Sequence, residues 1–114
     1  MLDTALLFDI VPAAFREAGL EGTELLFALA RGYQKNGIDL AALPMKKWFD
    51  TNYHYIVPRI EADTTPALVG TKIIDEYLEA KALCIETRPR LIGPYTFLRL
   101  CSYREGVDRE KLTV

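Results

Sequence analysis

The stretch MKKWFDTNYHYIVP, residues 45–58, decides the fold, because it is the densest run of aromatic and β-branched side chains in the chain. Residues of these types favour extended backbone, since their side chains pack well on a pleated surface. We therefore expect a strand over 45–49 and extended chain as far as Val57. Asp50–Asn52 interrupts the run with turn-forming residues, so a break is expected there.

Helical segments are expected before this stretch. Apolar residues recur at helical spacing over 2–10, which predicts a helix there. Pro12 can begin a second short helical turn, with Gly19 as its stop. Thr23 is expected to cap a helix over 24–31, which is apolar on most sides and is followed by a glycine that ends it.

One helix and one strand are expected after the stretch. Thr71 is expected to cap the clearest helix of the chain, over 72–83, where an apolar stripe faces away from charged residues. Leu91–Ile92 is expected to be a short buried strand that leads into a loop. The remaining segments are turn-like at 33–44, loop-like at 61–71, apolar and unassigned at 95–101, and a charged, fraying tail from Tyr103.

The order helix, strand, helix, strand predicts an α/β fold. Two strands joined by a helix form a crossover unit, which is expected to be parallel and right-handed. Half of the residues are hydrophobic and about a quarter are charged, as expected for one soluble globular unit over 1–114. Two or three strands are too few to close a (β/α)8 barrel, which needs about 250 residues.

Composition excludes several classes of function. The net charge of -2 does not favour binding to nucleic acid or to an anionic membrane, and no apolar run approaches the roughly 20 residues of a membrane span. Asp3 lies within the first apolar stretch, which argues against a secretory signal. Cys84 and Cys101 form no CxxC pair and have only His54 to join them in a metal site. We expect two reduced, packed thiols in a cytoplasmic protein, with no metal held by this chain.

Candidates for chemistry are few, and no catalytic residue is expected. The sequence has no Gly-rich phosphate loop, no nucleophile elbow and no carboxylate cluster with metal-ligand spacing. Lys46 and Lys47 precede Trp48–Phe49, so they either hold a flat anionic ligand or are a solvated pair of charges. His54 lies between two tyrosines, where a partly buried, hydrogen-bonded structural histidine is more common than a catalytic one.

The run at 45–58 resembles a signature of the N-terminal domain of cobalamin-independent methionine synthases. That family carries Lys-Trp-Phe, then Asp or Asn, then Thr-Asn-Tyr-His-Tyr and Val-Pro. Further stretches resemble the family in the same order, so that the resemblance covers nearly the whole chain: 3–12, 30–32, 76–81 and 91–98. The resemblance implies an internal fragment of a (β/α)8 barrel, with few parallel strands and several helices, and not a closed barrel.

The resemblance also implies a function. The family transfers a methyl group from 5-methyltetrahydrofolate polyglutamate to homocysteine, and its N-terminal barrel helps to hold the folate. The lysine of the Lys-Trp-Phe motif contacts methylfolate, and here that position is Lys47; Trp48, Asn52 and His54 are expected to line the site. The family's Arg-Glu-Leu-Lys folate loop, its zinc ligands and its homocysteine site are expected outside this chain. A truncated chain of this kind is expected to be inactive alone, with no cofactor of its own.

The chain departs from the family at four positions. Pro44 and Arg59 stand where glutamates are expected, and Arg90 interrupts an apolar strand start. Cys84 replaces a glycine after a helix, where positive φ would cost a cysteine roughly 1 kcal/mol. Such changes suggest a decaying gene as one hypothesis. Self-association is expected of an inactive fragment with exposed faces. The alternatives are a small module that binds folate or polyglutamate or pairs with a separate catalytic chain, and an unrelated α/β interaction domain.

Overall fold

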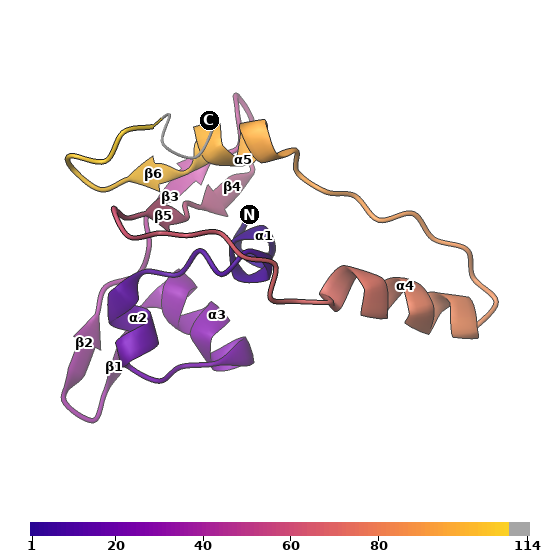
Figure 1. The fold of residues 1–114 in the computed structure, drawn as a ribbon, viewed down its shortest axis with the longest axis horizontal. Helices are drawn as coiled ribbons and strands as arrows, with labels where there is room; N and C mark the ends of the chain where they lie inside the picture. The colour runs from indigo at the N-terminus through magenta and orange to yellow at the C-terminus, as the bar shows by residue number, and fades with distance from the viewer. Residues whose placement is uncertain (110–114) are drawn as a thin grey trace.

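Five helices and six short strands follow one another in residues 1–109, the part of the chain that the computed structural model describes (Figure 1). The mixed α/β composition of the prediction is confirmed, and the described residues form no closed barrel. The helices are α1 (Leu2–Leu7), α2 (Ala13–Glu17), α3 (Gly22–Arg31), α4 (Lys72–Ala82) and α5 (Pro94–Leu100). The strands are β1 (Tyr33–Lys35), β2 (Ile38–Leu40), β3 (Met45–Lys47), β4 (His54–Ile56), β5 (Arg59–Ile60) and β6 (Ser102–Tyr103).

The described strands form three separate two-stranded sheets. β1 with β2 and β3 with β4 are antiparallel hairpins, whereas β5 and β6 pair in parallel. The expected parallel crossover from 45–49 to 91–92 is therefore wrong. Residues 91–92 are not in a strand, and Pro94 begins α5 instead, because its fixed φ and missing N–H suit the first helical turn.

Two helices end in the same hydrogen-bonded motif. After α4, Cys84 has a φ of 60°, its N–H donates to Lys81 O at 2.9 Å, and the Ile85 N–H donates to Ala80 O at 3.0 Å. This is the Schellman arrangement, in which a residue with left-handed backbone satisfies the last carbonyls of a helix. Asp9, with a φ of 56°, ends α1 in the same way. That turn explains why α1 stops at Leu7 and does not reach residue 10 as predicted.

The region of α3 and the first hairpin differs from the prediction in two respects. The helix begins at Gly22 with Glu21 as its N-cap, so Thr23 lies inside it and caps nothing. Residues 33–40 form a hairpin that the prediction missed, with Asn36 and Gly37 at φ of 52° and 77° in its turn. Two successive positive φ values are the requirement of a type I′ turn, which suits Asn-Gly.

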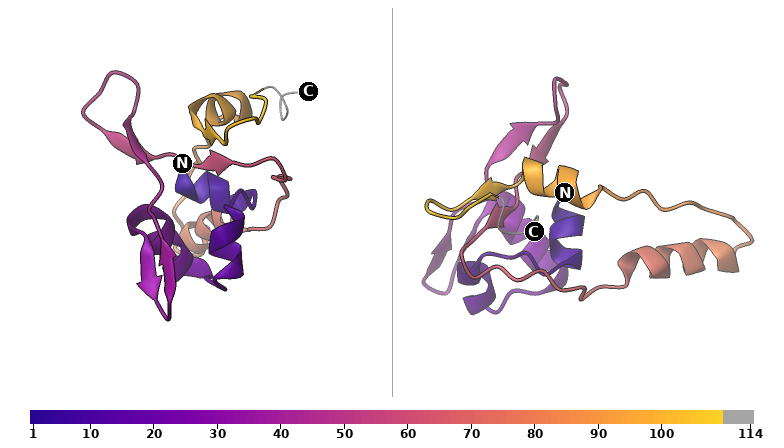
Figure 2. Two further views of the ribbon diagram at one scale, coloured as in Figure 1. Left: turned by 90° about the vertical axis from the view of Figure 1, so that its left-hand side faces the viewer. Right: turned by 45° about the horizontal axis from the view of Figure 1, so that its top comes forward.

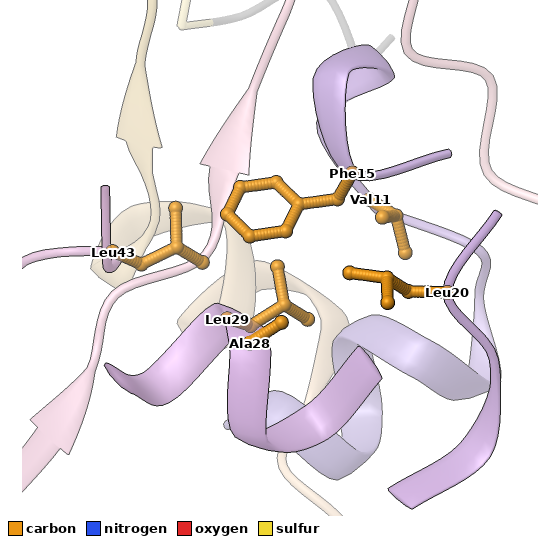
Figure 3. Packing of buried hydrophobic residues seen from close by; sticks show 6 residues of the cluster. All are labelled: Val11, Phe15, Leu20, Ala28, Leu29 and Leu43. Atoms are coloured by element: carbon orange, nitrogen blue, oxygen red, sulfur yellow. The ribbon is translucent and has the colours of Figure 1, made fainter. Parts of the chain in front are cut away.

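Two buried clusters hold the body of the molecule together. The first packs α2 and α3 against the segment that leads into β3 (Figure 3), and its members are Val11, Phe15, Leu20, Ala28, Leu29 and Leu43. The second joins α1, β5 and α5 through Ala5, Ile10, Ile60, Phe97 and Cys101. Because these members come from distant parts of the sequence, burial of their apolar surface is what brings the short elements together.

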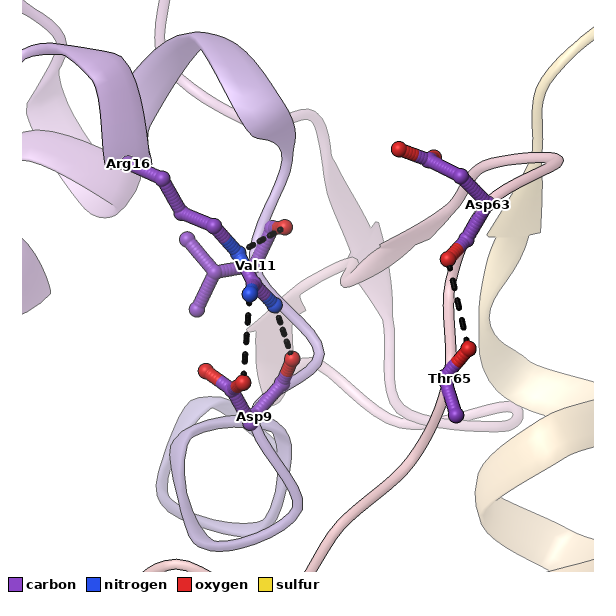
Figure 4. A network of polar contacts seen from close by, with 5 residues as sticks. All are labelled: Asp9, Val11, Arg16, Asp63 and Thr65. Atoms are coloured by element: carbon purple, nitrogen blue, oxygen red, sulfur yellow. Dashed lines mark hydrogen bonds and ion pairs between the residues drawn. The ribbon is translucent and has the colours of Figure 1, made fainter.

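Arg16 fastens α2 to the chain that leaves α1 (Figure 4). Its guanidinium donates to the backbone carbonyls of Asp9 and Val11, and it lies 3.2 Å from the Asp9 carboxylate. The bonds hold the tight turn at Asp9 in place. Elsewhere in the same view, the Thr65 hydroxyl donates to the Asp63 carbonyl at 3.5 Å and stabilises the loop after β5.

Helix α4 projects from the body as an arm (Figures 1 and 2). None of its residues is buried. Its first residue is Lys72, whose Nζ lies 3.2 Å from the Asp3 carboxylate and 3.7 Å from that of Glu76. Thr71 is the N-cap as predicted, yet its hydroxyl donates to the Asp75 side chain and makes no bond to the helix backbone. The arm is thus attached to the body mainly at its base.

The charged C-terminal segment begins in an ordered strand. Tyr103 lies in β6 and its hydroxyl donates to Leu98 O at 2.7 Å, so the tail does not fray from this residue as expected. The rest of the prediction for this segment, at residues 110–114, lies outside the described residues.

Candidate functional site

The hairpin of β3 and β4 carries the residues singled out from the sequence. Met45 is opposite Ile56, Lys46 is opposite Tyr55, and Lys47 is opposite His54. Residues that are directly opposite in an antiparallel pair share one face of the sheet, and successive residues alternate between faces. Lys47 and His54 therefore lie on the same face, whereas Lys46 and Tyr55 lie on the other.

The face of Lys47 and His54 is open to solvent. Both side chains are exposed, so the expected partly buried, aromatic setting of His54 is wrong. The His54 Nδ1 lies 2.9 Å from the carbonyl oxygen of Asn52, which fixes the ring at the base of the loop. Within residues 1–109, Lys47 makes no ion pair or hydrogen bond through its side chain. The Lys47 ammonium is thus available to an anionic ligand, while His54 offers only its Nε2 on the same face, because its Nδ1 is bonded to Asn52.

The opposite face anchors the hairpin through aromatic contacts. Trp48 packs edge-on against Tyr55, with ring centroids 5.7 Å apart and planes at 90°, and against Phe49 at 4.9 Å. The Tyr55 hydroxyl donates to Leu100 O at 2.9 Å, at the end of α5. Burial raises the pKa of this phenol, which keeps it protonated and able to donate. Trp48 therefore supports the hairpin from the side away from Lys47.

The loop between the strands depends on a residue that the sequence reasoning missed. The Thr51 hydroxyl donates to the carbonyl oxygen of Trp48 and accepts from the Tyr53 N–H at 3.3 Å. Phe49 adopts a left-handed φ of 51° and is largely exposed. Asn52 is exposed beside Thr51, with its carbonyl directed to His54. A threonine within a predicted break is the signal that could have identified this turn, because its hydroxyl bonds to nearby backbone.

Two departures from the family signature flank this hairpin. Pro44 accepts a hydrogen bond from the Val57 N–H at 2.8 Å, a contact that needs only its carbonyl oxygen. Arg59 places its Nε 3.5 Å from Glu61 Oε1, and this nitrogen has no hydrogen-bond partner with good geometry. The ion pair still compensates the buried carboxylate of Glu61, which is 9% exposed.

The other two departures, Cys84 and Arg90, lie at the end of α4 and in the segment that follows it. Arg90 is exposed and not in a strand, so the expected cost of burying it does not arise. Cys84 is exposed, which makes its predicted packing wrong, whereas Cys101 is buried as predicted, and both are free thiols. Burial raises the pKa of Cys101 to about 12. Cys101 is therefore an inert, packed side chain at neutral pH.

Among residues 1–109, no three His, Cys, Asp or Glu side chains lie close enough together to hold a metal ion. Over the same residues, no helix has the length and apolar character needed to cross a membrane.

Comparison with known proteins gives one consistent result. The family described as "Cobalamin-independent synthase, N-terminal domain" matches residues 1–114. A protein of Bifidobacterium animalis subsp. lactis, named 5-methyltetrahydropteroyltriglutamate–homocysteine methyltransferase, is 60% identical over 100% of this chain and 15% of its own length. Proteins of the same name from Streptococcus pneumoniae and Streptococcus thermophilus are 57% and 54% identical over 96% of the chain. The chain thus spans about 15% of the length of these relatives.

Proposed function

We propose that this chain, which belongs to the cobalamin-independent methionine synthase family as part of its N-terminal domain, binds 5-methyltetrahydrofolate polyglutamate through Lys47. The observation that carries this proposal is the pairing of Lys47 with His54 on one open face of the β3–β4 hairpin. The ligand in the relatives' protein name carries several carboxylates, and a lysine with no ion-pair partner among residues 1–109 offers them a strong, charge-assisted contact.

The supporting residues have distinct roles in this proposal. Lys47 binds a carboxylate, and His54 adds a second polar group on the same face. Asn52 lines the edge of the site from the loop and orients His54 through its carbonyl. Trp48 acts from the opposite face, where its packing on Tyr55 keeps β3 in register with β4.

We further propose that the chain performs no methyl transfer alone, and that it acts in the cytoplasm together with a chain that supplies the homocysteine site. The relatives are named for a reaction between two substrates, and this chain covers about 15% of their length. Zinc, which the family resemblance places in another barrel, would be supplied by that partner.

Membership of this family also supports the proposal that the chain is a fragment of a (β/α)8 barrel. β5 and β6 pair in parallel, and the segment between them contains α4 and α5, as in a crossover connection. The parallel neighbours that a barrel would place beside β3 and β4 would then come from the partner chain. In isolation, the two strands pair with each other instead.

Calorimetric titration of the purified chain with 5-methyltetrahydropteroyltriglutamate tests the proposed binding. We expect saturable binding that weakens about tenfold or more in Lys47→Ala, since hydrogen bonds to charged groups contribute about 1.5–3 kcal/mol. Lys46→Ala is the matched control, because Lys46 has the same charge and lies on the other face of the hairpin. No binding by the wild-type chain, or an equal loss in both variants, would contradict the proposal. A test of His54→Ala then measures the second contact.

A further inference from the structure

Two arginines in the segment after α4 have side chains that the fold does not use. Arg88 and Arg90 are both exposed, and within residues 1–109 neither side chain makes an ion pair or a hydrogen bond. A guanidinium group is always charged and carries five N–H donors. The donors of both groups are therefore available to a ligand.

Both arginines line one hollow, which lies between α4 and the segment that follows it. This segment runs back along the helix toward α5 (Figure 1), and the Tyr77 hydroxyl joins the two by donating to Glu86 at 2.9 Å. The hollow has a volume of about 430 Å³, and the half-buried side chains of Ile73 and Tyr77 line it from the helix. Sites for small molecules have volumes of about 300–1,000 Å³, so the hollow is large enough for one.

Pro89 restricts the backbone between the two arginines. Its ring fixes its own φ, and it disfavours helical backbone at the preceding residue, Arg88. Residues 85–93 contain no helix, and residues two apart in extended backbone point to the same side. The position of Arg88 and Arg90 in the lining of one hollow agrees with this rule. A ligand that binds both groups therefore has less backbone freedom to remove than in a flexible loop.

The carboxylates around this hollow already have partners of their own. Glu76 is the only acidic residue in its lining, and the Glu76 carboxylate lies 3.7 Å from the Lys72 Nζ. Glu86 accepts the hydrogen bond from Tyr77. The two guanidinium groups, in contrast, have no counter-charge within ion-pair distance among the described residues. The hollow therefore favours an anionic ligand over a cationic one.

We propose that this hollow binds a small organic phosphate monoester, whose phosphate is held by Arg88 and Arg90. A phosphate monoester carries a charge of about −1.5 to −2 at neutral pH and three acceptor oxygens, so it can engage two guanidinium groups at once. A single carboxylate has one charge and two oxygens, which one bidentate arginine already satisfies. Thr87 adds a hydroxyl to the lining, and Ile73 and Tyr77 offer apolar surface to the organic part.

This proposal does not depend on folate binding. Lys47 and His54 belong to the β3–β4 hairpin, and neither lines the hollow. Arg90 stands where the family signature has an apolar residue, so the site does not follow from the family resemblance. Failure of folate binding and failure of phosphate binding are therefore separate results.

Calorimetric titration of the full chain with phenyl phosphate, at neutral pH and low salt, tests the site. We expect saturable binding of one molecule per chain, and at least about tenfold weaker binding in Arg88→Gln and in Arg90→Gln, because each variant leaves the phosphate with one guanidinium. Arg31→Gln is the matched control, since Arg31 is equally exposed, lies at the end of α3 and does not line the hollow. Absence of saturable binding by the wild-type chain, or an equal loss in the control, overturns the proposal.

Two further titrations distinguish recognition of a phosphate from general attraction of an anion to positive charge. Arg88→Lys and Arg90→Lys keep the charge but lose the planar fork of donors, so we expect weaker binding of phenyl phosphate in both. Benzoate carries the same ring with a carboxylate, and we expect it to bind the wild-type chain at least about tenfold more weakly than phenyl phosphate does. Unchanged binding in the lysine variants, or equal binding of the two ligands, overturns the proposed recognition.

Discussion

Cys84→Gly should stabilise the end of α4. Cys84 holds a φ of 60°, with its N–H bonded to Lys81 O at 2.9 Å and the next N–H bonded to Ala80 O at 3.0 Å. These two bonds require left-handed backbone at this one residue. An L-residue with a Cβ crowds its own carbonyl in that conformation, and glycine does not.

The magnitude follows from two opposing terms. Removing the Cβ relieves roughly 1–2 kcal/mol of left-handed strain. Glycine loses more backbone entropy on folding, which costs roughly 0.5–1 kcal/mol. The thiol contributes little, because Cys84 is exposed. The net expectation is a gain of about 0.5–1 kcal/mol for the folded arm, which is equivalent to a two- to fivefold change in its opening equilibrium.

Amide hydrogen exchange of α4 is the appropriate assay. No residue of α4 is buried, so the arm can open without unfolding the body, and a global denaturation curve would miss most of the effect. We expect amide exchange within α4 to slow two- to fivefold in Cys84→Gly and to remain near the wild-type rate in Cys84→Ala, which keeps the Cβ. Equal exchange in the two variants, or faster exchange in Cys84→Gly, would refute the reasoning.

Two further predictions concern buried groups. Burial raises the pKa of Cys101 from 9.0 to about 12. The unfolded thiol therefore ionises first, and stability should fall by up to about 4 kcal/mol as pH rises through this window; urea unfolding of Cys101→Ala should show less of this loss. Arg59→Glu, which restores the residue expected in the family, should lower stability by about 1–2 kcal/mol, because it places a second carboxylate beside Glu61. Arg59→Gln should fall between Arg59→Glu and wild type, and no loss in Arg59→Glu would contradict the ion pair's role.

Helices and turns were the predictable part of this fold, because their signals are local. The apolar pattern predicts a helix over 72–83, and the observed α4 ends only one residue earlier, at Ala82. The turn-forming residues Asp50–Asn52 predict the loop that lies between β3 and β4. The Asn36-Gly37 turn was equally local, but the flanking strands have three residues each, and only β2, Ile38–Leu40, alternates apolar and polar residues. Short strands of this kind are defined by their partner, which the sequence does not name.

Strand pairing was the unpredictable part. Leu91–Ile92 is an apolar pair before Gly93, and such a pair becomes a buried strand only if neighbours cover both faces. In the described residues it lines an open groove, and Leu91 remains 65% exposed. The apolar run at 95–101 carried no decisive period, and Pro94 was the overlooked signal for α5.

The candidate site also has a part that the sequence predicts and a part that depends on strand pairing. Lys47 could be selected from the sequence, but its face could not be assigned until the register with His54 was known. His54 was expected to be partly buried because tyrosines flank it. In a strand, neighbours of a residue point to the opposite face, so the burial of Tyr55 implies the exposure of His54. The alternation rule was sufficient to correct this point.

The departures from the family signature bear on the hypothesis of a decaying gene. Random substitutions would be expected to leave unpaired charges and broken hydrogen bonds near the buried clusters. Pro44 instead stands where only a carbonyl oxygen is used, Arg59 pairs with the buried carboxylate of Glu61, and Arg90 lies in solvent. Cys84 carries backbone strain that nothing nearby offsets, and it lies at the end of the arm, which contributes nothing to either cluster. The buried Arg59 Nε also lacks a hydrogen bond of good geometry. The departures thus leave both buried clusters intact, and the one departure with left-handed backbone lies outside them.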